Sequence, residues 1–254
     1  MPFTVKYQPT ALNQCLFPDQ ATADIIHDIA ADLTDMNLVL YGPMGTGKSL
    51  MAKLIAEELS NNRVATYERF EGATYTTAAK VHDLVKLIDN QNKYVNVFAK
   101  RRLFIIEEFD RVDFPSQIAF GHLMTTPNVQ FVFTTNHVAN IDQRLLSRAH
   151  PCNITGGTQK DMLTLAQHVI QTEGVTATPS QLNSLVQNAK GNVRDLLNDL
   201  EAFVLIQRKT TARAVSAAVP AVNILPTQQN VQPQSPNAAP DANVHPASTA
   251  QPTS

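Results

Sequence analysis

The sequence predicts an α/β fold, in which a parallel sheet is flanked by helices and followed by a small all-helical lid domain. Short apolar runs alternate with longer amphipathic segments up to about residue 157, which is the pattern of a parallel sheet covered by helices. From Thr158 onward only segments with helical periodicity follow. We therefore expect an α/β domain at residues 1–157, a helical lid domain at 158–214 and a tail at 215–254.

Each expected element is an apolar run or an amphipathic segment of suitable length. The expected strands are residues 37–41, 63–68, 103–106, 130–134 and, with a weaker signal, 152–155. The helices of the α/β domain are expected at residues 48–60, 78–90, 114–124 and 141–147. Those of the lid domain are expected at residues 159–172, 179–189 and 192–209.

The tail differs from the rest of the chain in composition. Residues 215–254 are built from Ala, Pro, Gln, Asn, Ser and Thr, and they include seven prolines and a single acid, Asp241. Such a segment has too little apolar surface to offset the entropy of ordering, so it is expected to be disordered. A partner-binding peptide around residues 222–225 is the alternative.

Composition and charge exclude several classes of protein. With 20 basic and 22 acidic residues the net charge is −2, so any contact with nucleic acid must come from a local surface. The two cysteines, Cys15 and Cys152, lack metal-ligand spacing and suit a reducing compartment. No apolar run approaches the roughly 20 residues that cross a bilayer. A cytoplasmic protein without a membrane partner is expected.

The strongest motif is a phosphate-binding loop that fits G-x-x-x-x-G-K-[ST]. It consists of Gly42, Pro43, Met44, Gly45, Thr46, Gly47, Lys48 and Ser49. An apolar run precedes it and an amphipathic helix follows, which is the context this loop requires. Its backbone N–H groups and the helix N-terminus face an anion, Lys48 reaches the outer phosphates and Ser49 offers a hydroxyl to Mg²⁺. The motif predicts ATP and Mg²⁺ as cofactors.

A second motif places two acids at the end of an apolar strand. The run Leu103-Phe104-Ile105-Ile106 is followed by Glu107-Glu108-Phe109-Asp110. The carboxyl end of a parallel strand is where such sheets bind ligands. Glu107 is expected to organise Mg²⁺, although its side chain is longer than the usual Asp and must fold back or bind through water. Glu108 is the expected general base. A solvated charge pair is the structural alternative.

A third element is an apolar strand that ends in Thr134-Thr135-Asn136. Asn136 is positioned by sequence order to hydrogen-bond the attacking water or the γ-phosphate. Asparagine also closes strands because it suits turns, so this signal alone is weak.

These motifs, in this order, resemble those of AAA+ ATPases and more narrowly the motor subunits of sliding-clamp loaders, especially of tailed bacteriophages. The resemblance covers about residues 5–209. It also rests on Lys6-Tyr7-Gln8-Pro9, Cys15-Leu16-Phe17-Pro18, Glu107 to Arg111, Leu146-Ser147-Arg148 and Gly191-Asn192-Val193-Arg194.

The resemblance implies roles for further residues. Tyr7, Pro9 and Phe17 would lie on the adenine side of the site. Arg148 would be an arginine finger that reaches the nucleotide of a neighbouring subunit, and Arg194 would contact the phosphates in its own subunit. The alternatives are packed aromatic residues near the N-terminus and solvated surface arginines.

Three departures from the family qualify the resemblance. Glu107 stands where the family has Asp, Ala149 stands where the clamp-loader motif has Cys, and we expect no third helical domain of the kind that forms the collar of clamp loaders. Assembly into a ring or arc would then depend on the ATPase domains, a partner or DNA.

The implied function is an ATP-dependent loader in DNA replication that forms a self- or hetero-oligomer, with a sliding clamp and primer-template DNA as partners. Basic residues with possible nucleic-acid contacts are Lys80, Lys86, Lys93 and Lys100-Arg101-Arg102, which otherwise are solvated charges. The alternatives are a nucleotide-responsive scaffold with little hydrolysis, a helicase loader and a branch-migration motor. A small-molecule kinase would leave Asn136, Arg148 and Arg194 unexplained.

Overall fold

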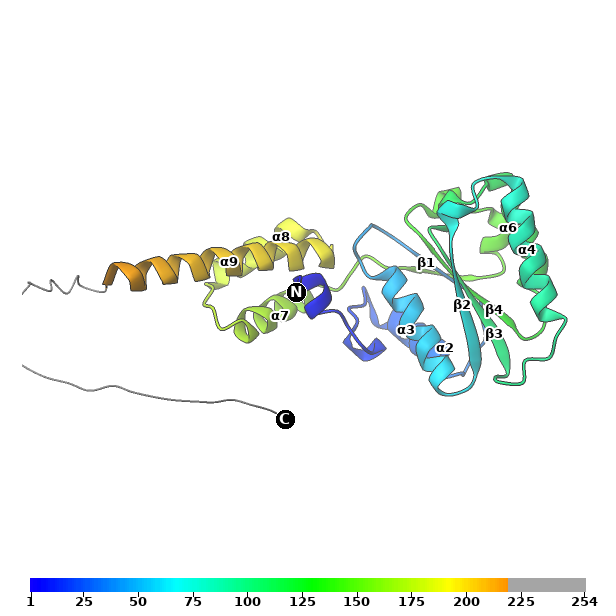
Figure 1. Ribbon diagram of the computed structural model, residues 1–254, viewed down its shortest axis with the longest axis horizontal. Coiled ribbons are helices and arrows are strands. Elements are labelled where there is room, and N and C mark those ends of the chain that lie inside the picture. The colour runs from blue at the N-terminus through cyan, green and yellow to red at the C-terminus, as the bar shows by residue number, and fades with distance from the viewer. Residues whose placement is uncertain (219–254) are drawn as a thin grey trace, which may run out of the picture.

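The computed structural model describes residues 1–218, and it contains an α/β domain joined to a smaller helical domain (Figure 1). Residues 219–254, which include most of the expected tail and the possible peptide at 222–225, lie outside this range. Within residues 1–218, no helix is long and apolar enough to cross a membrane.

The α/β domain is built on five parallel strands in the order β2-β3-β4-β1-β5. Their bounds are Leu38–Tyr41 (β1), Ala65–Glu71 (β2), Arg101–Glu107 (β3), Val129–Thr135 (β4) and His150–Asn153 (β5). This order brings the carboxyl ends of β1, β3 and β4 together at one edge of the sheet. The predicted parallel sheet is confirmed.

Two strands, β3 and β5, begin two residues before their expected starts. Arg101 begins β3 two residues before the expected start, and its guanidinium donates to the Gln130 side chain of β4 at 2.9 Å. Both side chains are buried. β5 begins at His150 and contains Pro151, which an edge strand tolerates because one side of its backbone has no strand partner.

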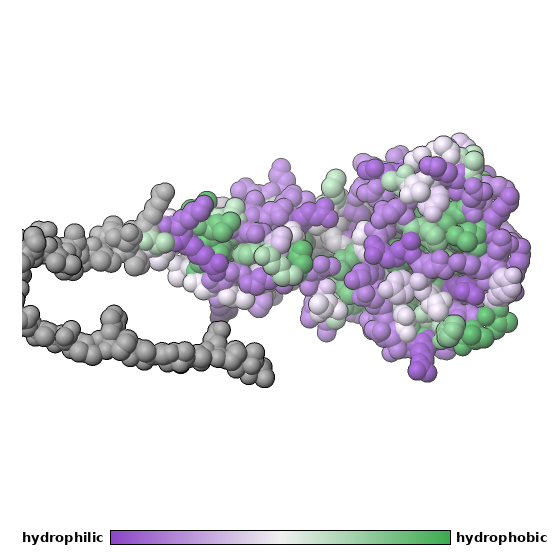
Figure 2. Space-filling model, in the orientation of Figure 1, coloured by the Kyte–Doolittle hydropathy of each residue, from purple (hydrophilic) through white to green (hydrophobic). Residues whose placement is uncertain are grey.

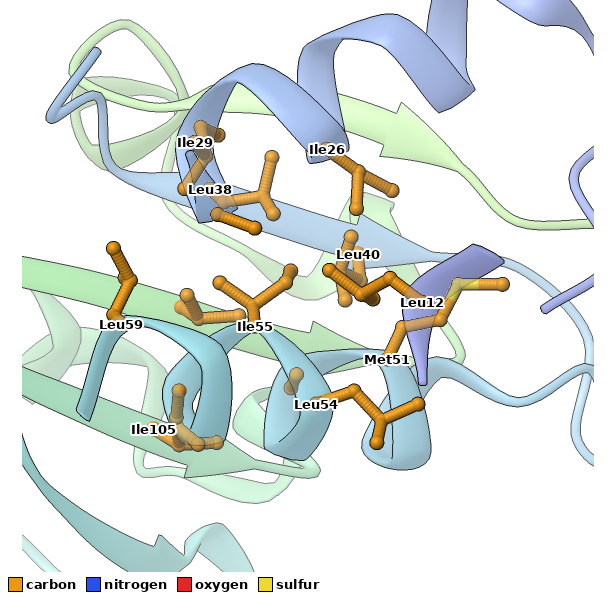
Figure 3. Packing of buried hydrophobic residues seen from close by; sticks show 14 of the residues in the cluster. Leu12, Ile26, Ile29, Leu38, Leu40, Met51, Leu54, Ile55, Leu59 and Ile105 are labelled. Atoms are coloured by element: carbon orange, nitrogen blue, oxygen red, sulfur yellow. The ribbon is translucent and has the colours of Figure 1, made fainter. Parts of the chain in front are cut away.

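Helices cover both faces of the sheet. Those of this domain are α2 (Gln20–Ala30), α3 (Lys48–Asn61), α4 (Ala78–Asn92), α5 (Phe120–Leu123) and α6 (Gln143–Leu146). Alternate side chains of β1 separate the two cores: Leu38 and Leu40 pack with α2 and α3, whereas Val39 packs with the face covered by α4 to α6. Figure 3 shows Ile26 and Ile29 of α2 beside Leu38 and Leu40 of β1.

Several expected helices differ from the observed ones. α2 was not expected, although Asp19 caps it by accepting a hydrogen bond from the Thr22 N–H. The segment expected as one helix over residues 114–124 is a 3₁₀ helix, η4 (Phe114–Ala119), followed by α5. The buried Gln117 holds this turn by donating to the Val112 and Asn140 carbonyls and accepting from the Asp142 N–H.

The lid domain is a bundle of α7 (Gln159–Thr172), α8 (Pro179–Ala189) and α9 (Val193–Ala218). The first two helices have the expected bounds, and each begins with a capping box, at Thr158 and at Thr178. α9 continues nine residues beyond the expected end at 209, so residues 215–218 are helical and do not belong to a tail. No proline occurs before Pro220 to stop the helix.

The N-terminal helix α1 (Phe3–Lys6) packs against the lid bundle and not against the sheet. Phe3 is buried among side chains of α7, α8 and α9, and its backbone N–H donates to Glu201 at 3.0 Å. The expected division assigned this segment to the α/β domain. The chain therefore crosses from the lid bundle to the α/β domain and returns to the bundle after β5.

Candidate functional site

The predicted phosphate-binding loop connects β1 to α3, and its shape depends on glycine. Gly42, Gly45 and Gly47 have φ values of 141°, 80° and 99°, which side chains disfavour. A Cβ at Gly42 would lie 2.3 Å from the Ile154 carbonyl oxygen. The loop therefore curls closely around the start of α3, whose N-terminus at Lys48 supplies the positive end of the helix dipole.

Lys48 is the buried cation of this loop. Its ammonium donates to the Gly42 and Pro43 carbonyls at 2.9 and 2.6 Å. Burial lowers the pKa of Lys48 to about 8, the nearby Asp110 carboxylate opposes this change and Arg194 adds to it. A phosphate bound beside the ammonium would favour its charged form.

A small cavity of about 170 Å³ lies in front of the loop. It gathers side chains from the loop, from the ends of β3 and β4 and from α9. The predicted residues among them are Met44, Gly45, Gly47, Lys48, Ser49, Glu108, Asn136 and Arg194. Five of these residues have polar or charged side chains, namely Lys48, Ser49, Glu108, Asn136 and Arg194. They line the same cavity although Lys48 and Arg194 are 146 positions apart in the chain.

Glu108 has a strained backbone at the end of β3. Its φ and ψ are 49° and 47°, a left-handed conformation that is uncommon for a residue with a side chain. Its backbone N–H donates to the Thr134 hydroxyl at 3.3 Å, and its carboxylate lies 2.9 Å from the Arg111 guanidinium. With this conformation Glu108 lines the small cavity, whereas the neighbouring Glu107 does not.

Glu107 is engaged by an arginine of the adjacent strand. The Arg69 Nε donates to Glu107 Oε1 at 2.9 Å, and a terminal guanidinium nitrogen of Arg69 contacts the same oxygen. Within residues 1–218 the other oxygen, Oε2, accepts no hydrogen bond. Glu107 is buried and does not line the small cavity. No local sequence pattern marks Arg69, because nothing in the chain order places β2 beside the motif.

The residues present fit a magnesium ion only together with a nucleotide. The described part of the chain has no group of three or more His, Cys, Asp or Glu that would hold a metal. The Ser49 hydroxyl and Glu107 Oε2 are the hard oxygen ligands that Mg²⁺ takes, and such sites are usually completed by phosphate and water. Arg69 already bonds Glu107 Oε1, so only Oε2 of this carboxylate would be free to bind a metal ion.

Two groups that the sequence analysis left without a role also belong to the site. The Thr135 hydroxyl donates to Asp110 Oδ1 at 2.8 Å, and Asp110 lies close enough to raise the pKa of Lys48. Asn192 packs against the loop, since a Cβ at Gly45 would lie 2.1 Å from its Oδ1. Next to it, the Arg194 N–H donates to the Gly45 carbonyl at 3.3 Å. The lid therefore touches the loop directly.

A larger cavity of about 740 Å³ adjoins the loop on the lid side. The cavity is lined by the segment from Thr4 to Pro9, by Gln14 to Leu16, by the loop and α3, and by α7 and α9. This volume lies in the range of small-molecule and cofactor sites. Tyr7 and Pro9, which the resemblance assigns to the adenine side, line it together with Thr46 of the loop.

Phe17 was expected in this group but lies elsewhere. It packs against the core under α2, with its ring centroid 5.6 Å from that of His27. The chain turns between Leu16, which lines the cavity, and Phe17, which does not. Phe17 and Leu16 differ in this way because neighbouring residues in an irregular segment point in different directions.

Arg148 lies apart from both nucleotide cavities. It is exposed, its guanidinium donates to the Arg144 carbonyl at 2.7 Å, and it borders a different hollow beside Asn37 and Met124. Arg148 therefore lines neither of these two cavities of its own chain.

The basic residues considered for nucleic acid differ in availability. Arg101 is buried and bonded to Asp32 and Gln130, so its role is structural. Lys100 also pairs with Asp32, and Lys93 pairs with Asp89. Arg102 donates to the Tyr94 carbonyl. Lys80 and Lys86 are exposed on α4.

Comparison with known families identifies the α/β domain. Residues 38–154 match the ATPase family associated with various cellular activities (AAA). This segment begins at β1 and ends just after β5, so it contains the whole sheet and the phosphate-binding loop.

Curated relatives extend the similarity into the lid. The chain is 26% identical over 206 residues to a probable replication factor C subunit 2 of Dictyostelium discoideum, covering 80% of this chain and 60% of the relative. It is 26% identical over 209 residues to replication factor C subunit 4 of Encephalitozoon cuniculi, covering 78% and 63%. With the replication factor C large subunit of Pyrococcus abyssi it shares 22% identity over 209 residues, covering 80% and 42%. The chain spans less than two thirds of each of these relatives.

Solved structures share the fold. The Holliday junction branch migration motor RuvB of Thermotoga maritima superposes with a TM-score of 0.59 at 13% identity, covering 83% of this chain and 67% of that one. A replication initiator DnaA bound to AMPPCP and single-stranded DNA gives the same TM-score at 17% identity, covering 84% and 69%. Residues 38–154 are therefore similar to AAA ATPase domains, and the chain is similar to replication factor C subunits over about four fifths of its length.

Proposed function

We propose that this chain is the ATP-hydrolysing motor subunit of a sliding-clamp loader. The observation that carries the proposal is the small cavity, where Lys48, Ser49, Glu108, Asn136 and Arg194 converge. The adjoining cavity of about 740 Å³ has room for the nucleoside part of ATP. Homology to replication factor C subunits supports the choice of a clamp loader among AAA ATPases.

Each group of the small cavity has a separate role in the proposed hydrolysis. The loop N–H groups and Lys48 hold the phosphates, and Arg194 reaches the same point from the lid. Glu108 accepts a proton from the attacking water, which Asn136 helps to orient. When bound beside Ser49 and Glu107, Mg²⁺ supplies positive charge that offsets the developing charge on the phosphate oxygens.

The position of Arg148 supports an assembly. Because it is exposed and lines neither cavity of its own chain, its positive charge is available to a neighbouring subunit. An arginine that reaches a neighbour's γ-phosphate in this way raises the hydrolysis rate by roughly 10³-fold or more. We therefore propose a ring or arc in which each complete site is shared by two subunits.

An exposed apolar loop supports a protein partner. Between α4 and β3, the side chains of Tyr94, Val95, Val97 and Phe98 are 75 to 86% exposed. Figure 2 shows hydrophobic atoms at the lower right edge of the α/β domain, where this connection runs in Figure 1. Monomeric proteins rarely expose several large apolar side chains together. We propose that this loop contacts the sliding clamp, while Lys80 and Lys86 face primer-template DNA.

A nucleotide-responsive scaffold with little hydrolysis is the second candidate. The contact of Arg69 with Glu107 favours it, because a guanidinium on the first acid weakens that carboxylate as a metal ligand. Both candidates bind ATP and assemble. They differ in turnover, since only the loader hydrolyses ATP at a rate that rises with primer-template DNA.

Mixing two inactive variants tests the shared site. Arg148→Ala removes the finger and keeps the phosphate-binding loop, whereas Lys48→Ala removes the charge that binds phosphate and keeps the finger. Each protein alone is expected to hydrolyse ATP poorly, and a mixture is expected to recover activity at the interfaces that combine an intact loop with an intact Arg148. Lys160→Ala, which removes an exposed cation on α7, is the matched control.

The particle mass with a non-hydrolysable ATP analogue, with and without primer-template DNA, accompanies the rate measurement. An assembled mixture that stays inactive would exclude the shared site. Near-normal ATP affinity of folded Lys48→Ala would exclude the loop as the phosphate site. Assembly without turnover by the parent protein would favour the scaffold.

A further inference from the structure

Three donors from two helices converge on a single carboxylate at the end of α7. Glu173 Oε1 accepts hydrogen bonds from the Tyr7 hydroxyl at 2.7 Å and from the Lys6 ammonium at 2.5 Å. Its Oε2 accepts from Arg208 of α9 at 2.7 Å, and the same guanidinium nitrogen bonds the Glu173 carbonyl at 3.0 Å. The side chain of Glu173 is only 5% exposed. One acid therefore ties α1 to both α7 and α9.

This cluster is charged at neutral pH. The Lys6 ammonium, followed by the Tyr7 hydroxyl, lowers the pKa of Glu173 to about 2, and Arg208 adds to the effect. Hydrogen bonds to an ionised carboxylate are stronger than neutral ones. The Tyr7 ring is further held by edge contacts with Phe3 and His168, at centroid distances of 5.3 and 6.3 Å. Tyr7 therefore has little freedom to leave the lid bundle.

The tied segment is a wall of the larger cavity. Thr4, Lys6, Tyr7, Gln8 and Pro9 line it, and Glu173 does not. Besides Glu173, this wall is anchored on the lid by the buried Phe3, whose N–H donates to Glu201, and by the Tyr7 ring. Beyond Pro9 the chain leads to a short 3₁₀ helix at Leu12–Gln14. The position of this wall relative to α7 and α9 thus depends on an acid that lies outside the cavity.

We propose that Glu173 is a positioning residue that fixes the N-terminal wall of the nucleotide cavity to the lid and thereby sets the affinity for the nucleoside part of the ligand. The inference rests on the proposed function, because it assumes that the cavity of about 740 Å³ accepts the nucleoside. It assigns the phosphates to the loop and to Lys48, which Glu173 does not touch. Binding of the two parts of the ligand should therefore respond differently to this residue.

Glu173→Gln separates the two parts. The amide keeps the size of the side chain but loses the charge, and one acceptor becomes a donor that opposes either Arg208 or the Lys6 and Tyr7 pair. We expect the Kd for ADP to rise about tenfold, which corresponds to the loss of a hydrogen bond to a charged group. The Kd for inorganic tripolyphosphate should stay within about twofold, as should kcat at saturating ATP, so that KM alone increases.

Tyr7→Phe removes only one hydroxyl and is the milder variant. It is expected to raise the Kd for ADP about threefold, and it keeps the ring that packs between Phe3 and His168. Asp89→Asn removes an exposed ion pair with Lys93 on α4 and is the control, with no expected change in either Kd.

The measurements are competition titrations of a fluorescent ADP analogue with ADP and with tripolyphosphate. An unchanged ADP affinity in both Glu173→Gln and Tyr7→Phe would overturn the proposal. An equal loss for ADP and tripolyphosphate would also overturn it, because it would indicate general damage to the fold. If the parent protein binds neither ligand, or if Lys48→Ala binds both normally, it is the proposed nucleotide site that fails.

Discussion

The two sides of the candidate nucleotide site are held together in different ways. On the phosphate side, Glu108 and Asn136 directly follow β3 and β4, Lys48 and Ser49 follow β1 after the phosphate-binding loop, and Arg194 comes from the lid. The parallel sheet sets the distances between the first four groups. On the base side, Tyr7 and Glu173 are 166 positions apart and are joined by a side-chain hydrogen bond.

This difference has a mechanical consequence. The phosphate side rests on a sheet whose central strands are buried on both faces, so removal of one side chain leaves the others in place. The base side rests on a few contacts between α1 and the lid, which are exposed at their margins. Substitution of Glu108 or Asn136 on the phosphate side should change turnover at nearly constant affinity, whereas substitutions on the base side should change affinity at nearly constant turnover.

The largest expected effect comes from Glu108→Gln on the phosphate side. It removes the proposed general base while the amide keeps the shape of the site, so turnover should fall by about 10²-fold or more. The Kd for ATP should change little, because the sheet still holds the loop. Rates of ATP hydrolysis and equilibrium ATP binding check both parts.

Glu107→Gln is the matched variant for this experiment. Residue 107 is the last residue of β3, one position before Glu108, and the substitution leaves Arg69 in place. If Glu107→Gln abolished turnover with binding intact and Glu108→Gln did not, the roles of the two acids would be exchanged.

The same difference explains what the sequence predicted and what it did not. Lys48, Ser49, Glu108 and Asn136 were found because the phosphate side is a set of short motifs, each with its chemistry in consecutive residues. Such motifs do not predict the order of the strands in the sheet. The contact of Arg69 in β2 with Glu107 was therefore not predicted.

The base side was predicted less well for the same reason. Tyr7 and Pro9 line the cavity as the family resemblance implied, but Phe17 does not, and the segment that carries Tyr7 packs on the lid. Neither Glu173 nor Asn192 has a local pattern that marks it, because each acts through a residue far away in the chain. The helices α7 and α8 have the predicted bounds, because amphipathic periodicity is a local signal.

Gly45 is the point where the two sides meet, and Gly45→Ala should have an intermediate effect. The new Cβ would lie 2.1 Å from the Asn192 side chain, and the residue would keep a φ of 80° that alanine disfavours by roughly 1–2 kcal/mol. We expect nucleotide affinity to fall about tenfold, because the loop and the lid must move apart.

The double variant Gly45→Ala with Asn192→Gly separates the two causes. It removes the clash but not the backbone strain, so part of the affinity should return. Recovery of full affinity would mean that the strain is negligible, and no recovery would mean that contact with the lid is irrelevant at this point.

The smallest expected effect is that of Phe17→Leu, and it tests the limit of the base side. Phe17 lies one position beyond Leu16, which lines the cavity, but its own ring packs against His27 and the core under α2. Loss of this aromatic contact should lower the free energy of unfolding by about 1 kcal/mol. The Kd for ADP should change by less than about twofold, because no wall of the cavity moves.

Tyr7→Phe is the matched variant and should do the reverse, with weaker ADP binding and a smaller change in stability. Thermal unfolding and ADP titration of both variants side by side make the comparison. A clear loss of ADP affinity in Phe17→Leu would show that Phe17 contributes to the adenine side. The inference that the lining of the cavity ends at Leu16 would then be wrong.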